Sequence, residues 1–323
     1  MAWRLRLAPE KTNIDFFRWQ WVMFGGSWLL MVGAVLAWIF MGLNFGIDFQ
    51  GGTSIRTQST QALDVGVYRQ ALIALDLGDV AITQVFDPTF AADQYVAQVR
   101  IAAQDGAEAV PADVLAQVQG ALRAVDPAVQ FTATESVGPK VSSELIWSAV
   151  LAMVAAGAGI MFYIWLRFEW QYAVGAVVAL FHDIIVTVGI FAVFQLKFDL
   201  TIVAALLTIL GYSINDTVVV FDRLRENLRK YKTMPLRDVM NLSVNEILSR
   251  TLATSLTTLI ALGAMLIFGG DVIRGFAFAI FVGVILGTYS SVYVAKNLVL
   301  FLGLDRGDKP KKGLQNEFAN IDA

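Results

Sequence analysis

Some ionisable side chains lie within or at the edge of long apolar segments, and they are the residues best placed to do chemistry. His182 and Asp183 are adjacent near the middle of one segment, Asp216 lies in the next, and Arg250 stands at the start of a third. A charged side chain at the centre of a membrane helix costs about 2.5 to 3.5 kcal/mol, so each needs a partner or a function. A partly desolvated carboxyl takes up a proton readily and releases it when a cation approaches, which would make Asp216 a proton carrier.

Uncharged polar residues repeat with helical spacing along the same faces as Asp216 and Arg250. They are Thr201, Thr208, Tyr212 and Asn215 before Asp216, and Thr254, Thr257 and Thr258 after Arg250. Two such stripes facing inward could enclose a hydrated path, with Ser213, Asn215 and Thr254 serving the relay or helix packing. Asp216 and Arg250 also fall at similar depth from one side of the membrane, so an ion pair is feasible. The alternative is that this pair, or hydrogen bonds alone, only joins the helices.

Two interpretations of the adjacent pair His182 and Asp183 stay open, an active proton relay and a polar pair that packs helices. His182 is the only histidine, and the chain has no cysteine. The sequence also lacks a nucleophile motif and a spacing typical of metal ligands. We therefore expect no catalytic residue, no metal and no cofactor, and a protein that is not an enzyme. The absence of an oxygen cage around Asp216 favours protons over sodium ions as the coupling ion.

The elements that would position these side chains are membrane helices. The 323 residues are 57% hydrophobic and 16% charged, whereas soluble domains are roughly a quarter charged. Six apolar runs reach the length of about 20 residues that spans a bilayer, at 21–43, 145–166, 172–196, 200–221, 252–268 and 276–304. The first run is too long for a cleaved signal peptide and reads as a retained anchor. The net charge of −3 argues against nucleic acid as a partner.

Orientation follows from Lys and Arg, which gather on the cytoplasmic side of membrane proteins. Six alternating spans place most of these residues on one side, in a head of residues 1–18, a segment 222–250 and a tail 305–323. The first span then occupies 19–43 and the other five fall within 141–304. Both termini of this multi-pass protein are therefore expected to be cytoplasmic.

Residues 44–140 form a separate, acidic domain outside the cytoplasm. Period-two alternation predicts strands at 53–58, 80–87, 94–102 and 129–137, and apolar spacing of three and four predicts helices at 62–77 and 111–126. This β-α-β-β-α-β order is that of a ferredoxin-like α+β domain. Two helices would cover one face of the sheet. The other face could bind a ligand or pack against a partner domain.

Two glycine patterns indicate close backbone approaches. In the stretch GIDFQGG, the residues Gly46, Gly51 and Gly52 surround Asp48 and favour a tight turn. In the last span, small residues recur every four positions, which is typical of close helix packing: Gly275, Ala279, Gly283, Gly287 and Ser291. Whether the partner helix belongs to this chain or to another protein is left open.

Seven motifs in series resemble the SecF side of the SecD/SecF family of bacterial protein-export membrane proteins, part of the resistance-nodulation-division superfamily. They are GIDFQGG at 46–52, SVGPKVSSEL at 136–145, IWLRFEW at 164–170, FHD at 181–183, GYSINDTVVVFDRLREN at 211–227, SVNEILSRTLATSLTT at 243–258 and GTYSSVYVA at 287–295. Singly, several of these motifs are weak. Their order on a six-span layout is specific.

The resemblance implies a subunit that works with SecD beside the SecYEG channel, with SecA acting on the cytoplasmic side and YajC and YidC as further partners. Such proteins use the proton-motive force to draw unfolded preproteins across the membrane. Asp216 would correspond to the proton-carrying carboxylate and Arg250 to the arginine that modulates it. A further carboxylate would come from SecD.

The sequence departs from the family pattern at a few positions. Gln50 stands where Thr is common, and Glu246 and Ile247 stand where Gln and Thr are common. Glu246 lies one helical turn before Arg250 and could pair with it, in competition with Asp216.

Two rival functions remain. A proton-driven exporter of small molecules or lipids, usual in the wider superfamily, would have twelve spans and two large outer insertions, against six and one here. A passive membrane scaffold would require Asp216 and Arg250 to be replaceable.

Overall fold

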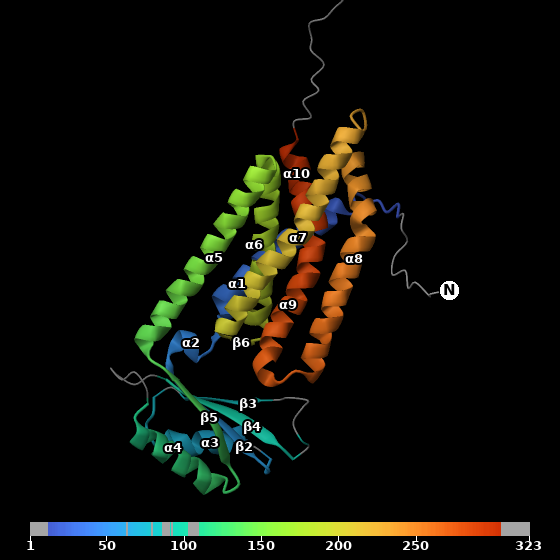
Figure 1. The fold of residues 1–323 in the computed structure, drawn as a ribbon. Coiled ribbons are helices and arrows are strands. Elements are labelled where there is room, and N and C mark those ends of the chain that lie inside the picture. The colour runs from blue at the N-terminus through green and yellow to red at the C-terminus, as the bar shows by residue number, and fades with distance from the viewer. Residues whose placement is uncertain are drawn as a thin grey trace, which may run out of the picture.

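The computed structural model describes residues 12–62, 64–78, 80–85, 91, 93–102 and 110–304. Most of the predicted cytoplasmic head, 1–11, and the tail 305–323 lie outside these residues. The described chain forms a bundle of long helices with a small sheet domain at one end (Figure 1). This arrangement confirms the expected fold class, a helical membrane protein with one α+β domain.

Six helices are long and apolar enough to cross a membrane, as the hydropathy pattern predicts. They are α1 (Gln20–Met41), α5 (Pro139–Arg167), α6 (Trp170–Val193), α7 (Leu200–Lys230), α8 (Leu236–Phe268) and α9 (Asp271–Ser290), which continues through a π-helix (Ser291–Ala295) into α10 (Lys296–Leu302). At 31 residues, α7 is about 46 Å long, which exceeds a hydrocarbon core of about 30 Å. The segment 222–250 is therefore mostly helix, the ends of α7 and α8 joined by a turn.

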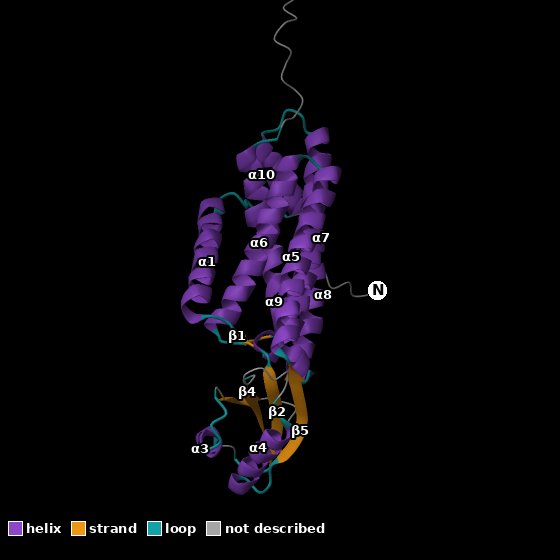
Figure 2. Ribbon diagram, turned by 90° about the vertical axis from the view of Figure 1, so that its left-hand side faces the viewer, coloured by secondary structure: helices purple, strands orange, loops and turns teal. Residues whose placement is uncertain are grey.

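The sheet domain has the predicted β-α-β-β-α-β order. Its elements are β2 (Gly52–Ser59), α3 (Val65–Ile73), β3 (Val80–Val85), β4 (Tyr95–Ile101), α4 (Ala112–Val125) and β5 (Gln130–Val137). The four strands are antiparallel in the order β3-β4-β2-β5, so the last strand pairs with the first. Helices α3 and α4 lie on the side of the sheet away from the membrane helices (Figures 1 and 2).

The opposite face of the sheet is polar and makes a contact toward the bundle. Gln98 donates to Ser54 across this face at 2.7 Å, and Arg100 Nη1 donates to the carbonyl oxygen of Phe45 at 2.5 Å. Phe45 belongs to the junction with the membrane helices. The sequence left open whether this face of the sheet binds a ligand or packs against other parts of the protein. The contact between Arg100 and Phe45 shows packing against the junction.

The GIDFQGG turn lies at the junction between the sheet domain and the bundle. Strand β1 (Asn44–Phe45) pairs in parallel with β6 (Lys197–Phe198), and the short helix α2 (Ile47–Gln50) follows β1. Gly51 and Gly52 have φ of 70° and 109°, values that side chains rarely permit. Asp48 Oδ2 accepts a hydrogen bond from the Leu200 amide at 3.0 Å, the first residue of α7. The turn therefore fastens the sheet domain to the outer end of α7.

The small-residue stripe of α9 packs against α7 of the same chain, which answers the question that the sequence left open. A Cβ atom on Gly283 would overlap the side chain of Ile209, and one on Gly287 would lie 3.1 Å from Ser213 Cβ. Gly275 similarly faces Ile202. The helices can approach this closely only because these α9 positions lack a side chain.

We predict that Gly283→Ala destabilises the helix bundle by about 1 to 3 kcal/mol, because the added methyl group overpacks the contact with Ile209. Thermal unfolding of the full chain in detergent would measure the loss. Gly263→Ala on α8 is the matched control, since a Cβ there meets nothing within 4 Å. Equal melting temperatures for the two variants would contradict the packing assignment.

A buried hydrogen bond joins the two helices of the sheet domain. The Tyr68 hydroxyl donates to Asp126 Oδ2 at 2.9 Å, and both side chains are buried. Burial and this hydrogen bond raise the pKa of Tyr68. The folded domain therefore favours the protonated phenol, and this contribution to stability is present below the ordinary tyrosine pKa of about 10 and is lost as the pH rises above it.

Tyr68→Phe should destabilise the sheet domain by about 1 to 3 kcal/mol at neutral pH, because a buried carboxylate oxygen loses its donor. The difference from the unmodified chain should shrink above pH 10. Pulse proteolysis of the full chain in urea would report the stability of the domain. Tyr95→Phe, in β4 without such a bond, should behave like the unmodified chain, and a pH-independent difference for Tyr68→Phe would refute the titration.

Candidate functional site

Asp216 is buried in α7, with 3% of its surface exposed, and its Oδ2 has no hydrogen-bond partner among the described residues. Its α7 neighbours Ser213 and Thr217 are fully buried, and the Thr217 hydroxyl donates to the Ser213 carbonyl oxygen. Buried polar atoms in folded proteins are almost always paired. The buried Asp216 Oδ2, which has no partner among the described residues, departs from this rule and therefore suggests a functional role.

The expected ion pair between Asp216 and Arg250 is absent from the described residues. The side chain of Arg250 is exposed and makes no ion pair among the described residues. Nor does Glu246 bind Arg250, because it accepts hydrogen bonds from Arg223 Nε at 2.7 Å and Asn227 Nδ2 at 2.6 Å. Both donors lie on α7 opposite Glu246.

The two polar stripes are largely exposed in this chain taken alone, so the hydrated path between them stays a prediction. On α7, Thr201, Thr208 and Asn215 are exposed, and on α8 so are Thr254 and Thr257. Their threonine hydroxyls mostly bond backbone carbonyl oxygens one turn earlier, and the Tyr212 hydroxyl reaches Thr258 at 3.5 Å. Helical periodicity shows that the residues of a stripe lie on one face of their helix. It does not show which neighbouring helix covers that face. In this chain α9 covers the other side of α7.

His182 and Asp183 form the centre of a fully buried polar cluster. His182 Nδ1 lies 2.9 Å from Asp183 Oδ1, and Asp183 Oδ2 accepts from Ser213 at 2.6 Å and Ser290 at 2.8 Å. These residues come from α6, α7 and α9. Asp183 therefore has partners on both carboxylate oxygens and joins three helices, in contrast to Asp216.

The cluster extends to α1 through Tyr289. Its ring centroid lies 6.2 Å from that of His182, and its hydroxyl donates to the Met23 carbonyl oxygen at 2.6 Å and lies 2.8 Å from Ser27 Oγ. The remaining ring nitrogen, His182 Nε2, has no partner among the described residues. The one histidine thus stands between the α1 contact and the three-helix cluster.

Sequence reasoning missed Lys296, a fully buried lysine at the start of α10. Its Nζ lies 3.8 Å from the ring centroid of Phe17 and 5.8 Å from those of Phe16 and Tyr293. A lysine inside the last apolar run was the available signal. The two phenylalanines belong to a segment that Asn241 and Asn245 of α8 hold through bonds to the backbone of Ile14 and Phe16.

No group of three or more His, Cys, Asp or Glu side chains in the described part of the chain could hold a metal ion. Within the membrane-spanning part, Asp216 and the pair of His182 and Asp183 are the acidic and histidine groups that are buried. Proton binding is the chemistry that such groups can perform without a cofactor.

A family model described as protein export membrane protein SecD/SecF, C-terminal, matches residues 117–305, and one described as the SecD/SecF GG motif matches residues 36–62. The first match covers more than half of the chain. This chain belongs to the SecD/SecF family. The second match contains the turn that fastens the SecD/SecF sheet domain to α7.

Similar proteins carry the name protein translocase subunit SecF. The chain is 67% identical to that of Cereibacter sphaeroides over 100% of both chains, and 65% identical to that of Rhodobacter capsulatus over 99% of this chain and 98% of the relative. It is 38% identical to protein translocase subunit SecDF of Brucella abortus, over 94% of this chain and 40% of that protein.

Solved structures of SecDF share the fold. The crystal structure of SecDF from Thermus thermophilus matches with a TM-score of 0.82 and 33% identity, over 91% of this chain and 39% of that one. A SecDF structure in a super-membrane-facing form matches with a TM-score of 0.66 and 35% identity. The chain is thus a translocase subunit that corresponds to about two fifths of a SecDF polypeptide.

We predict that the two intramembrane aspartates differ in their effect on stability. Asp183→Ala should destabilise the bundle by about 3 to 5 kcal/mol, because it removes one side of a buried, hydrogen-bonded pair. Ser290→Ala should cost about 1 kcal/mol, the loss of one hydrogen bond. Asp216→Asn should change the melting temperature little, since Asp216 Oδ2 has no partner to lose. Thermal unfolding in detergent would measure all three, and a large loss for Asp216→Asn would contradict the contrast.

Proposed function

We propose that this translocase subunit, together with SecD, couples the proton-motive force to a late, SecA-independent movement of preproteins across the inner membrane. The observation that carries the proposal is the buried, unpaired carboxylate oxygen of Asp216. A group that binds a proton reversibly must not be held in one state by fixed partners. Asp183, whose oxygens take part in three hydrogen bonds, serves packing in this proposal.

Arg250 supplies the change in electrostatic environment that a carrier needs. With its guanidinium away from Asp216, desolvation favours the protonated carboxyl, and its approach favours release of the proton. The exposed side chain of Arg250 has room to move because Glu246 is bound elsewhere. Moving one elementary charge through 100 mV supplies about 2.3 kcal/mol, enough to shift a two-state equilibrium more than tenfold.

A second subunit is required because the polar face of α7 and α8 is exposed in this chain. Polar side chains in membrane helices face protein or water rather than lipid. The relatives named SecDF contain a matching segment within a chain more than twice as long. We infer that SecD covers the face bearing Asn215, Arg250 and Thr254 and adds a further carboxylate to the relay.

Helix α7 provides a route from Asp216 to the sheet domain. Asp216 lies 16 residues, or about 24 Å, from the first residue of α7, where Asp48 binds the Leu200 amide. A tilt or shift of α7 would therefore move the GG turn and the sheet domain with it. In this proposal, movement of the sheet domain pulls the unfolded preprotein outward.

The wider assembly follows the same proposal. The subunit would stand beside the SecYEG channel with both termini in the cytoplasm, take over preprotein that SecA has pushed through, and have YajC and YidC as neighbours. The cationic ends of α7 and α8 agree with this orientation. No observation favours export of small molecules, and the similar proteins reported above are named as translocase subunits.

Asp216→Asn should abolish the stimulation of preprotein transport by an imposed proton gradient, because it keeps the size of the side chain and removes its titration. Transport into inverted membrane vesicles with and without the gradient measures the effect. Arg250→Ala should lower the stimulation by about tenfold, in line with loss of one charge interaction of about 1.4 kcal/mol.

Asp238→Asn is the matched control, because it removes an exposed carboxylate in the first turn of α8 outside the apolar core. Its stimulation should equal that of the unmodified chain. Full gradient-driven transport by Asp216→Asn would refute the carrier assignment, and full activity of both Asp216→Asn and Arg250→Ala would favour a passive scaffold.

A further inference from the structure

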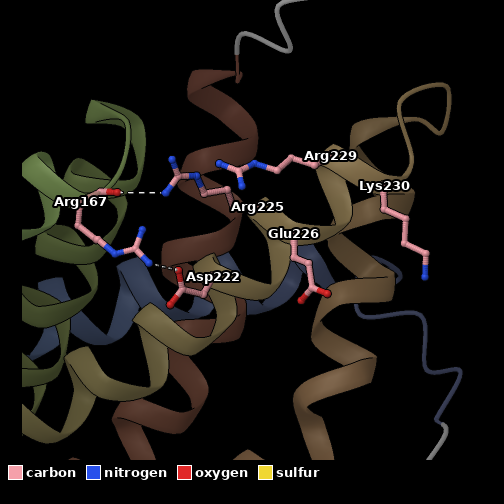
Figure 3. A pocket seen from close by; sticks show the side chains of 6 residues that line it. All are labelled: Arg167, Asp222, Arg225, Glu226, Arg229 and Lys230. Atoms are coloured by element: carbon pink, nitrogen blue, oxygen red, sulfur yellow. Dashed lines mark hydrogen bonds and ion pairs between the residues drawn. The ribbon is translucent and has the colours of Figure 1, made fainter.

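A cavity of about 530 Å³ at the end of the bundle away from the sheet domain is lined by charged residues (Figure 3). They are Arg167 at the end of α5, and Asp222, Arg225, Glu226, Arg229 and Lys230 of α7. Four cations face two carboxylates. The cavity therefore carries a surplus of positive charge.

Both carboxylates of the cavity are already matched by arginines. Asp222 Oδ1 lies 3.4 Å from Arg167 Nη2, and Glu226 Oε2 lies 2.6 Å from Nη1 of Arg223, which is outside the cavity. In Figure 3 the carboxylate of Glu226 points away from the arginines of the cavity. The carboxylates thus leave the other cations of the cavity uncompensated.

Arg225 and Arg229 lie one helical turn apart, and both side chains extend toward Arg167, so that the guanidinium group of Arg229 lies beside the side chain of Arg225 (Figure 3). Like charges at this spacing repel. Arg225 is held in place, since its Nη1 donates to the Arg167 carbonyl oxygen at 3.3 Å and its guanidinium carbon lies 6.0 Å from the Phe168 ring centroid. Neither arginine makes an ion pair within the described residues. A phosphate between the two planar groups would replace repulsion by charge-assisted hydrogen bonds.

The surface next to the cavity suits lipid chains. Helix α5 exposes most of its apolar side chains in this chain, although Ala149 and Ile164 are buried against the bundle. Trp165, Leu166 and Trp170 beside the cavity are 57%, 67% and 53% exposed. Exposed tryptophans mark the membrane interface, and basic pockets between membrane helices at this level suit anionic headgroups.

We propose that the Arg225–Arg229 cavity binds the phosphate group of an anionic phospholipid, with its acyl chains lying along α5. Soluble phosphate shares the charge and the oxygen donors but lacks the chains that would use the exposed α5 surface. The lipid would neutralise the surplus charge at the junction of α5 and α7. This site is separate from Asp216 and does not depend on the proposed proton coupling.

Native mass spectrometry of the full chain in detergent, titrated with dioleoyl phosphatidylglycerol, tests the proposal. Arg229→Gln should weaken binding about fivefold, and Arg225→Gln with Arg229→Gln about thirtyfold, as expected for about 1 kcal/mol per cation near a lipid surface. Lys232→Gln is the matched control, an exposed lysine just beyond α7 whose loss should change binding less than twofold. Dioleoyl phosphatidylcholine should bind weakly and equally to all variants.

Three results would overturn the proposal. Equal weakening by Arg229→Gln and Lys232→Gln would mean general surface charge rather than a site. Inorganic phosphate that binds as tightly as the lipid would mean a soluble anion as the occupant. Unchanged lipid binding by the arginine variants, with weaker copurification of SecD, would mean that an acidic segment of a protein occupies the cavity. If Arg229→Gln has the same melting temperature as the unmodified chain, a loss of lipid binding does not come from a loss of folding. Arg229→Lys keeps the charge and should bind the lipid with intermediate affinity.

Discussion

Close contact between α7 and α9 supports the arrangement of the other membrane helices. The contact exists because Gly275, Gly283 and Gly287 leave space for the side chains of α7. Within that space Ser213 reaches Asp183 on α6, and Ser290 reaches the same carboxylate oxygen from α9. No water competes for these hydrogen bonds in a hydrocarbon environment. The hydrogen bonds to Asp183 therefore fix the positions of α6, α7 and α9 relative to one another along the membrane normal. The opposite side of α7 is left for a partner.

Helix α7 therefore combines two surfaces with different roles. One surface packs tightly and has its polar groups paired, through Ser213 and the small residues of α9. The other carries exposed polar residues such as Asn215, with Asp216 buried between the two surfaces and unpaired at Oδ2. The outer end of the same helix is bound by Asp48 of the GG turn. A single rigid element thus connects the titratable carboxyl to the sheet domain.

Charge is distributed along the bundle in three levels. Near the middle, His182 and Asp183 form a compact pair that is fully removed from solvent. Toward the ends of α7 and α8, Arg223, Glu246 and Asn227 form a hydrogen-bonded group that keeps Glu246 away from Arg250. Beyond that, Arg225 and Arg229 leave positive charge unmatched. The departure of Glu246 from the family pattern thus has a local partner on α7.

The amino-acid sequence by itself determined the six membrane helices, the order of the sheet domain and the family. Apolar length, period-two alternation and the motifs around GIDFQGG and Asp216 are properties of short stretches of sequence. They can therefore be recognised without knowing which residues pack against them in the folded chain. The sequence also identified Asp216 and Asp183 as residues that membrane burial makes costly. From the sequence, Asp216 was expected to carry the proton, and the role of Asp183 was left open between relay and packing.

Only the tertiary structure decided which aspartate is satisfied, which helix packs on the glycine stripe, and which way the polar stripes face. Each depends on distant residues: Ser213 and Ser290 for Asp183, Ile209 for Gly283, and Arg223 for Glu246. Helical spacing specifies a shared face, but the identity of the helix that covers it is a property of the packed bundle. Lys296 was overlooked for the same reason, because two of the three aromatic rings around it, those of Phe16 and Phe17, come from a segment almost 280 residues away.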